Sequence, residues 1–207
     1  GPLARRLAIV QRHIAEYLDS RGDRHTSVIS MCSGDGRDLL GALASHGAKA
    51  GRLTALLVEL DPVLRRRARR RIRDAGLAGI QVVARDAGLS SSYVDAAPAD
   101  LVLACGVFGN VADEDVERTV RHMPRLCRQG ATVIWTRHRR PPDLTVSIRR
   151  WFREAGFENG AFEPVPDSFA SVGVERFKGE ALPLVAGTRL FEFDPGRQGR
   201  PRVSQAR

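Results

Sequence analysis

The sequence predicts an α/β fold with a mostly parallel sheet of seven strands and helices on both of its faces. Three observations lead to this prediction. Short apolar runs of strand length alternate with amphipathic helical segments through most of the chain. Two glycines, Gly34 and Gly36, stand where the first predicted strand passes into a helix. Two further strand-like runs follow one another within 156–177, which is typical of a closing antiparallel hairpin.

Length and composition indicate one globular domain. The 207 residues are 43% hydrophobic and 28% charged, which suits a single core with a small appendage. No apolar run approaches the roughly 18 residues that a membrane span needs, and the opening residues lack the features of a signal peptide. The three cysteines, Cys32, Cys105 and Cys127, are far apart and show no metal-ligand spacing. We therefore expect a cytoplasmic protein with reduced thiols and no metal.

The net charge of +9 raises the question of nucleic acid as a partner. Of the 33 basic residues only Lys49 and Lys178 are lysines, a bias that is typical of a GC-rich genome. Seven arginines lie within 65–73. The apolar residues around them recur at every third or fourth position, which predicts one apolar helix stripe with the arginines on the other faces. A solvated helix face is therefore favoured over a nucleic-acid patch.

The main domain is expected at 25–178, where strands and helices alternate. The predicted strands are 27–32, 52–60, 79–84, 99–107, 131–137, 156–165 and 168–177. The predicted helices are 37–46, 62–75, 113–127 and 143–156. Asp61-Pro62 and Asp143 are typical helix starts, whereas Gly47 and Gly156 are typical helix ends. Such alternation implies parallel strands joined by right-handed crossovers.

Two segments flank this domain. Residues 1–24 show helical spacing of apolar residues. This N-terminal helix either covers the ligand site, with His13 and Tyr17 facing it, or only packs on the domain, which is the favoured interpretation. Residues 179–207 form a C-terminal extension. Its first part is a candidate for one more strand, and the tail after Pro195 is expected to be disordered.

Three consecutive predicted strand ends carry residues suited to a ligand, which in such folds binds beyond the carboxyl ends of the strands. Gly34 and Gly36 follow the first strand, and glycine there permits either a tight turn or a close approach of the backbone to a ligand. Glu59 ends the second strand and can accept both hydrogen bonds of a ribose diol. Asp86 ends the third, with small Ala87 behind it. The succession favours the ligand over the simple turn.

These residues resemble the pattern of class I S-adenosylmethionine-dependent methyltransferases, whose sheet is Rossmann-like. The resemblance covers about 25–178 and includes the ending WFREAGFENGAF…SFASVGVERF. It implies S-adenosylmethionine as cofactor, with the glycine loop beside the methionine part, Glu59 on the ribose, and Asp86 with Ala87 at the adenine. The implied cofactor-binding residues are Ser33, Gly34, Asp35, Gly36, Glu59, Asp86, Ala87 and Cys105.

The first loop departs from the family pattern. Ser30 stands where the family often has an acid, and Cys32 stands at the usual first glycine. Asp35 or Asp38 is a candidate to replace the missing carboxylate toward the amino group of the cofactor.

Two other classes of protein are weighed against this one. A nicotinamide-dependent oxidoreductase needs a third glycine where this chain has Leu39. A short-chain reductase also needs Tyr-x-x-x-Lys, but Tyr17 is followed by Arg21 and Tyr93 by Ala97. A non-catalytic cofactor-binding module remains open on the sequence.

The methyl acceptor is expected at the loops after the fourth and fifth strands. These lack the Asn/Asp/Ser-Pro-Pro-aromatic and Pro-Cys motifs of nucleic-acid methyltransferases. Phe108 and Asn110 either shape the pocket, with Asn110 as a candidate catalytic group, or are a core aromatic and a turn residue. His138 is the candidate general base, with a surface histidine as the alternative. Arg137 and Arg37 are candidate substrate contacts because arginine suits anions.

The sequence therefore predicts a methyltransferase that transfers a methyl group to oxygen or nitrogen of a small, acidic or polar molecule by in-line displacement. RNA is the alternative acceptor because of the positive charge. No oligomeric state follows from the sequence.

Overall fold

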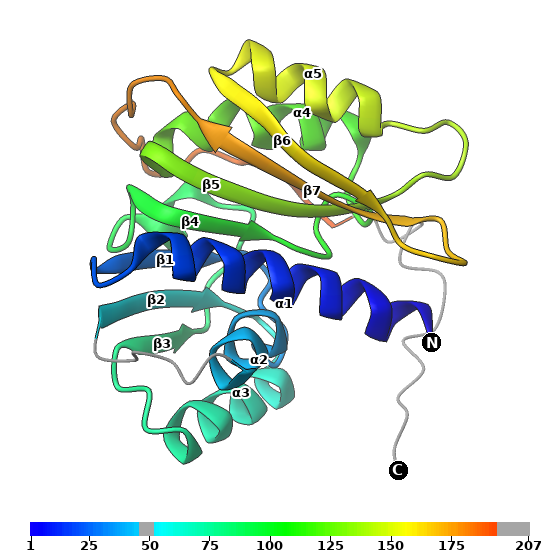
Figure 1. Cartoon of the computed structure of the whole chain (residues 1–207). Helices are drawn as coiled ribbons and strands as arrows, with labels where there is room; N and C mark the ends of the chain where they lie inside the picture. The colour runs from blue at the N-terminus through cyan, green and yellow to red at the C-terminus, as the bar shows by residue number, and fades with distance from the viewer. Residues whose placement is uncertain (46–51, 194–207) are drawn as a thin grey trace.

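The computed structural model describes residues 1–45 and 52–193 and contains one sheet of seven strands (Figure 1). The strands are β1 (Thr26–Ser30), β2 (Leu53–Val58), β3 (Ile80–Val83), β4 (Ala99–Ala104), β5 (Cys127–His138), β6 (Phe157–Pro164) and β7 (Ala170–Phe177). Their order is β3-β2-β1-β4-β5-β7-β6. Neighbours among β1 to β5 are parallel, whereas β7 is antiparallel to β5 and to β6. The predicted sheet and its closing hairpin are confirmed.

Helices cover both faces of this sheet (Figure 1). The helices are α1 (Pro2–Arg21), α2 (Arg37–Ser45), α3 (Pro62–Asp74), α4 (Asp113–His122) and α5 (Thr145–Glu154). α1, α2 and α3 pack on one face, and α4 and α5 pack on the other. None of the helices in the two described ranges is both long and apolar enough to cross a membrane.

The core is split by the sheet into two apolar layers. β4 is buried along its whole length, with Leu101 and Leu103 in the layer under α1 to α3. Val102 and Ala104 alternate with them and face α4 and α5. Because a central parallel strand is covered on both faces, it reads as a continuous apolar run rather than an alternating one.

Several element boundaries differ from the sequence prediction. α4 ends at His122 rather than at 127, because Pro124 has no N–H to continue the helix and the chain passes through a 3₁₀ turn into β5. β4 ends at Ala104, and Gly106 turns the chain with a φ of +80°. The candidate extra strand of the C-terminal extension is present only as two isolated bridges, Leu89 with Arg189 and Val111 with Phe193. The end of helix 37–46 and the tail after Pro195 lie outside the described residues.

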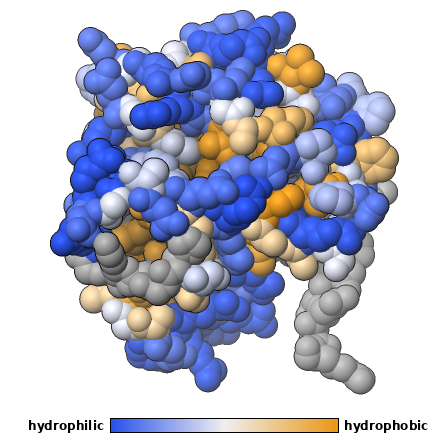
Figure 2. Space-filling model, in the orientation of Figure 1, coloured by the Kyte–Doolittle hydropathy of each residue, from blue (hydrophilic) through white to orange (hydrophobic). Residues whose placement is uncertain are grey.

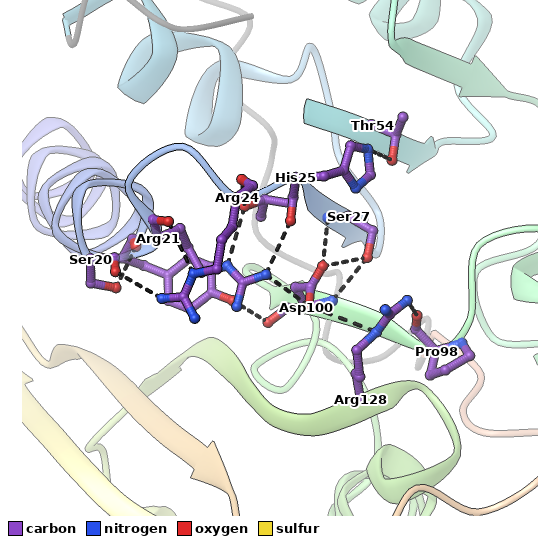
Figure 3. Close-up of polar contacts among 11 residues, drawn as sticks. Ser20, Arg21, Arg24, His25, Ser27, Thr54, Pro98, Asp100 and Arg128 are labelled. Atoms are coloured by element: carbon purple, nitrogen blue, oxygen red, sulfur yellow. Dashed lines mark hydrogen bonds and ion pairs between the residues drawn. The ribbon is translucent and has the colours of Figure 1, made fainter. Parts of the chain in front are cut away.

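The carboxyl-terminal end of α1 is fixed at the amino edge of the sheet by a polar network around Asp100 (Figure 3). Ser27 donates to Oδ2 of Asp100 from its backbone N–H and from its hydroxyl, both at 2.9 Å. Arg21 of α1 lies 3.3 Å from Oδ1, and the Tyr17 hydroxyl donates to the Asp100 carbonyl at 2.8 Å. Tyr17 is therefore committed to this edge, away from the strand ends where a ligand is expected.

The other end of α1 reaches the opposite, carboxyl edge of the sheet (Figure 1). Halfway along the helix, buried His13 has Nε2 2.8 Å from Oε1 of Glu163 on β6, and Arg12 pairs with the same carboxylate at 2.6 Å. In the first turns, Arg5 lies 3.7 Å from Asp167 in the β6–β7 turn. The predicted N-terminal helix thus packs on the domain and also extends to the edge where the ligand site is expected.

The side chain of Glu175 on β7 is a carboxyl group whose pKa is changed by burial in the sheet. Glu175 of β7 is fully buried and accepts hydrogen bonds from Nε1 of Trp135 at 3.2 Å and Nδ2 of Asn159 at 2.6 Å. Burial raises the pKa of Glu175 from 4.5 to about 6, against the lowering effect of these hydrogen bonds and of nearby Arg149.

The stability contribution of Glu175 should depend on pH. Because its pKa is higher in the folded than in the unfolded state, this contribution is complete below about pH 4.5 and is lost as the pH rises through about 6. Between these limits we expect the wild type to lose about 2 kcal/mol of unfolding free energy relative to Glu175→Gln. Urea unfolding of both proteins at a series of pH values measures this difference. Parallel curves would contradict it.

Candidate active site

The loop between β1 and α2 is shaped by two glycines with positive φ, Gly34 at +59° and Gly36 at +75°. A methyl group on Gly36 would lie 2.9 Å from Cδ1 of Leu40 and 3.1 Å from Cδ2 of Leu57, so this part of the loop is pressed against the core. A methyl group on Gly34 would meet nothing within 4 Å. The loop is therefore a tight turn at Gly36 and an open backbone surface at Gly34.

Glu59, directly after β2, joins this loop to the start of α3. Its Oε2 accepts from the backbone N–H of Gly34 at 2.8 Å, and its Oε1 accepts from the N–H of Asp61 at 2.8 Å. A carboxylate has about four acceptor positions. Two remain for a ligand, so Glu59 can stabilise the loop and still bind a diol.

Asp35 is buried in the same loop but is already paired. The Arg37 guanidinium lies 2.7 Å from Oδ2, and Arg71 of α3 lies 3.4 Å from the same atom. Burial raises the pKa of Asp35, but the hydrogen bonds and charge of Arg37, together with Arg71, bring it below its usual value. The structure thus places Arg37 and Asp35 in one ion pair.

Asp38, in the first turn of α2, is in a different position. It is partly buried and makes no hydrogen bond or ion pair with any residue of 1–45 or 52–193. Burial raises its pKa, and the positive charge of Arg6 on α1 opposes this effect. Asp38 also raises the pKa of the Cys105 thiol, after burial itself. Asp38, Arg6 and Cys105 therefore lie near one another at the ends of β1 and β4.

Ser33 gives a second unsatisfied group in this region. Its Oγ is buried and has no hydrogen-bond partner in the described part of the chain. Its backbone is tied on both sides, since its N–H donates to the Val58 carbonyl and its carbonyl accepts from Gly36, each at 3.0 Å. A buried hydroxyl without a partner costs free energy, and a polar ligand atom at this loop would remove that cost.

Asp86 and Ala87 follow β3. Oδ1 of Asp86 accepts from the Gly88 N–H at 2.8 Å, and Oδ2 lies 2.6 Å from Nη1 of Arg189. The carbonyl of buried Ala87 accepts from the Tyr93 hydroxyl at 2.6 Å. Asp86 thus stands at the predicted edge, but with a partner from the C-terminal extension that the sequence did not indicate.

The loop after β4 contains Phe108 and Asn110, the two residues that the sequence suggested for the substrate pocket. Phe108 is fully buried, with its ring centroid 6.0 Å from that of Trp135. The Asn110 side-chain amide donates to the Gly106 carbonyl at 2.7 Å and closes the turn. Phe108 is therefore a core aromatic and Asn110 a turn residue, which are the alternatives to a role at the substrate that the sequence left open.

Arg137 near the end of β5 is also buried. Its Nη2 lies 3.1 Å from Oδ1 of Asp113, and its Nη1 donates to the Phe108 carbonyl. The side chain therefore holds the β4 loop against the start of α4. Residues 131–137 of β5 are all buried, and only His138 at the end of the strand is partly exposed. The Arg137 guanidinium is thus occupied by contacts within the protein and is not placed to contact a substrate.

His138 ends β5 and lies beside the loop that follows β4. Its Cδ2 is 3.8 Å from where a side chain would begin on Gly109, and the Arg140 N–H donates to its Nδ1 at 3.3 Å. A neutral ring that accepts at Nδ1 carries its proton on Nε2. The Arg140 guanidinium lies over the ring of Phe169, 5.6 Å from its centroid, so a cation and an exposed aromatic lie near the same end of β5.

Sequence reasoning missed two residues of this edge. Arg6 faces Asp38 from α1, and Arg189 pairs with Asp86 from the C-terminal extension. For Arg6 the only available signal was its place on the N-terminal helix, for which covering the site was one of two interpretations. For Arg189 no local signal exists, because its partner lies 103 residues earlier in the chain.

Residues 28–130, about half of the chain, match the sequence model of a family described as "Methyltransferase domain". A search of curated proteins finds no match. Magnesium protoporphyrin IX methyltransferase from Synechocystis PCC 6803, with bound S-adenosylmethionine, is similar in structure. It has a TM-score of 0.66 at 11% identity, over 84% of this chain and 81% of that chain.

Two further solved structures share the fold. An O-methyltransferase family protein from Burkholderia thailandensis has a TM-score of 0.64 at 16% identity, over 84% of this chain and 55% of that chain. An rRNA methylase from Streptococcus thermophilus has a TM-score of 0.61 at 12% identity, over 83% of this chain and 95% of that chain. At these identities the likeness establishes the fold and leaves the acceptor open.

The family match, the sheet order and the glycine loop together define the class: the chain belongs to the class I S-adenosylmethionine-dependent methyltransferases. It is therefore an enzyme that uses S-adenosylmethionine as methyl donor. The residues of the carboxyl edge fit this cofactor, since Gly34 faces open space, the Ser33 hydroxyl lacks a partner among residues 1–45 and 52–193, and Glu59 retains acceptor capacity.

The two glycines of the loop should respond differently to alanine. Both have positive φ, which costs an alanine about 1–2 kcal/mol. Only Gly36 lacks room for the added methyl, so we expect Gly36→Ala to lose about 1 kcal/mol more unfolding free energy than Gly34→Ala. Urea unfolding of the two variants measures the difference, and equal losses would show that Leu40 and Leu57 yield without cost.

Proposed function

We propose that S-adenosylmethionine lies across the ends of β1, β2 and β3, with its methionine part at Gly34, its ribose at Glu59 and its adenine at Asp86 and Ala87. The observation that carries this proposal is the order of the groups along the edge. An open backbone surface, a carboxylate with spare acceptor positions and a second carboxylate follow one another on adjacent strands. Their order along the edge is the same as the order of the methionine, ribose and adenine parts in the cofactor.

The amino acid part of the cofactor is proposed to bind between Asp38 and Arg6. The ammonium group would meet the Asp38 carboxylate, and the carboxylate would meet the Arg6 guanidinium, two charges that have no ion-pair partner in 1–45 or 52–193. Asp35 is a weaker candidate for the ammonium because Arg37 and Arg71 already neutralise it. Binding would therefore complete an unsatisfied pair of opposite charges rather than break an existing one.

The bound cofactor supplies an electrophilic methyl group on a sulfonium sulfur. The protein's part is alignment, because in-line displacement depends on holding the acceptor on the axis of the breaking bond. In this binding mode Cys105 and the β4 loop would stand beside the methionine end, and His138 would stand where the acceptor enters. In its neutral form His138 would present Nε2–H as a donor that orients the acceptor, whereas its role as general base stays a prediction.

The proposed acceptor is a small molecule with an anionic group and an apolar part. Phe169, whose exposed fraction is 55%, and Arg140 on its ring offer an apolar surface next to a positive charge. The first turns of α1 approach the same loop, where Arg5 lies 3.7 Å from Asp167. One structural neighbour is named as a porphyrin methyltransferase, which supports a small acceptor by analogy.

RNA is less well supported as the acceptor. The solvent side of α3 is hydrophilic (Figure 2), but several of its arginines serve the protein itself. Arg65 donates to the Glu59 carbonyl, Arg69 to the Val82 carbonyl, and Arg71 lies 3.4 Å from Asp35. Three of the seven arginines thus also contact the protein itself, while Arg66, Arg67, Arg70 and Arg73 lie exposed on the solvent face of α3.

Replacing Asp38 by Asn should weaken binding of S-adenosylhomocysteine by about tenfold or more, because a charge-assisted hydrogen bond is lost. Asp35→Asn is the matched control and should lower stability while changing affinity by only about twofold. Calorimetric titration with S-adenosylhomocysteine measures both. The wild-type affinity should also fall as the pH drops through the raised pKa of Asp38, and this fall should be absent in Asp38→Asn. A larger effect of Asp35→Asn would assign the ammonium to Asp35.

Methyl transfer should be detected with small aromatic or branched carboxylates rather than with RNA. A screen with labelled S-adenosylmethionine against such acids, phenols, amines and total RNA tests this, and Arg140→Met should raise the KM for the acid. RNA-borne label, with affinity falling by roughly 0.9 log units per duplex phosphate contact for each tenfold rise in salt, would overturn it.

His138→Ala should lower kcat without changing cofactor affinity, and normal turnover would leave alignment alone as the source of catalysis.

A further inference from the structure

Residues 187–193, here called the C-terminal strap, cross the loops that follow β3 and precede α4. The Leu190 N–H donates to the Gly88 carbonyl at 2.7 Å, and the Thr188 carbonyl accepts from the Ser90 N–H at 2.9 Å. Leu190 and Phe191 are 0% and 1% exposed. The strap is therefore part of the packed structure, although it lies outside the residues that the family model matches.

Gly88 is a point of close backbone contact between the strap and the proposed adenine region. A methyl group at Gly88 would overlap the carbonyl oxygen of Phe191. Gly88 therefore has no room for a side chain, and the strap lies directly on the turn that carries Asp86. Through this contact the strap and the Asp86 turn form one unit.

Arg189 of the strap fixes the Asp86 side chain. The Gly88 N–H holds Oδ1 at 2.8 Å and Nη1 of Arg189 holds Oδ2 at 2.6 Å, so both carboxylate oxygens are held. The pKa of Arg189 is raised, chiefly by its hydrogen bond to Asp86. Each oxygen still has a second acceptor position, so a fixed Asp86 remains able to accept from a ligand.

We propose that Arg189 is a positioning residue of the cofactor site: it holds Asp86 in the orientation in which its carboxylate accepts the amino group of adenine. This inference rests on the proposed binding mode of S-adenosylmethionine. Its physical basis is preorganisation, because a side chain that is already ordered loses less conformational freedom when the ligand binds. The strap would then determine how strongly the site prefers adenine over bases without a donor at that position.

The test compares two ligands that differ only at this position of the base, S-adenosylhomocysteine and S-inosylhomocysteine. The inosyl ligand has a carbonyl where adenine has its amino group, so an ordered Asp86 should reject it. Calorimetric titrations of the full chain are made for the wild type, Arg189→Met, Arg189→Lys, Asp86→Asn and the Asp86→Asn/Arg189→Met double variant. Arg125→Met is the matched control, since Arg125 donates to the Pro183 carbonyl of the same extension and has no contact with Asp86.

Arg189→Met should reduce the preference for the adenosyl ligand by about tenfold, and Arg189→Lys by less. The double variant should show the same preference as Asp86→Asn alone, because Arg189 acts through Asp86. Arg125→Met should leave the preference unchanged, which separates positioning from loosening of the extension. An unchanged preference in Arg189→Met, or additive losses in the double variant, would overturn the inference. Failure of the wild type to bind S-adenosylhomocysteine would instead overturn the proposed cofactor binding mode.

Discussion

The parallel pairing of β1 with both β2 and β4 is the constraint on which the rest of the molecule depends. Val28 is paired with Ala55 on one side and with Leu101 on the other. A strand with neighbours on both edges and helices on both faces is mostly apolar at its centre, as Val28 and Ile29 are in β1, while Thr26, Ser27 and Ser30 lie toward its ends. Polar residues are therefore confined to the strand ends, and parallel pairing places the carboxyl ends side by side at one edge.

At this edge the same kinds of group build the loops and remain available to a ligand. Glu59 holds two backbone N–H groups, and Asp35 neutralises two arginines. Asp38 and the Ser33 hydroxyl are not used in this way within the described residues. A site that leaves specific polar groups unsatisfied gives up some stability, which a ligand of matching polarity returns on binding.

Two segments outside the central sheet complete the edge from opposite sides. α1 is fixed at the far edge by Asp100 and brings Arg6 to Asp38, while the strap brings Arg189 to Asp86. Both segments act at the site although neither belongs to the strands that define it. Buried apolar residues anchor both segments, Val10 and Ile14 in α1 and Leu190 and Phe191 in the strap, whereas the ion pairs at their ends are partly exposed.

The sequence by itself determined the succession of strands, the glycine loop, and the carboxylates Glu59 and Asp86 that follow β2 and β3, because periodicity and the residues after an apolar run are local properties. It also indicated the α/β class and the closing hairpin. Only the tertiary structure decided that Phe108 and Arg137 are internal, and that Arg189 reaches Asp86. It also decided that Asp35 is paired, whereas Asp38 is not paired within the described part of the chain. Arg71 is 36 residues from Asp35 and Arg189 is 103 residues from Asp86. No local pattern encodes such pairings, since they depend on where the sheet and its crossovers bring distant side chains together.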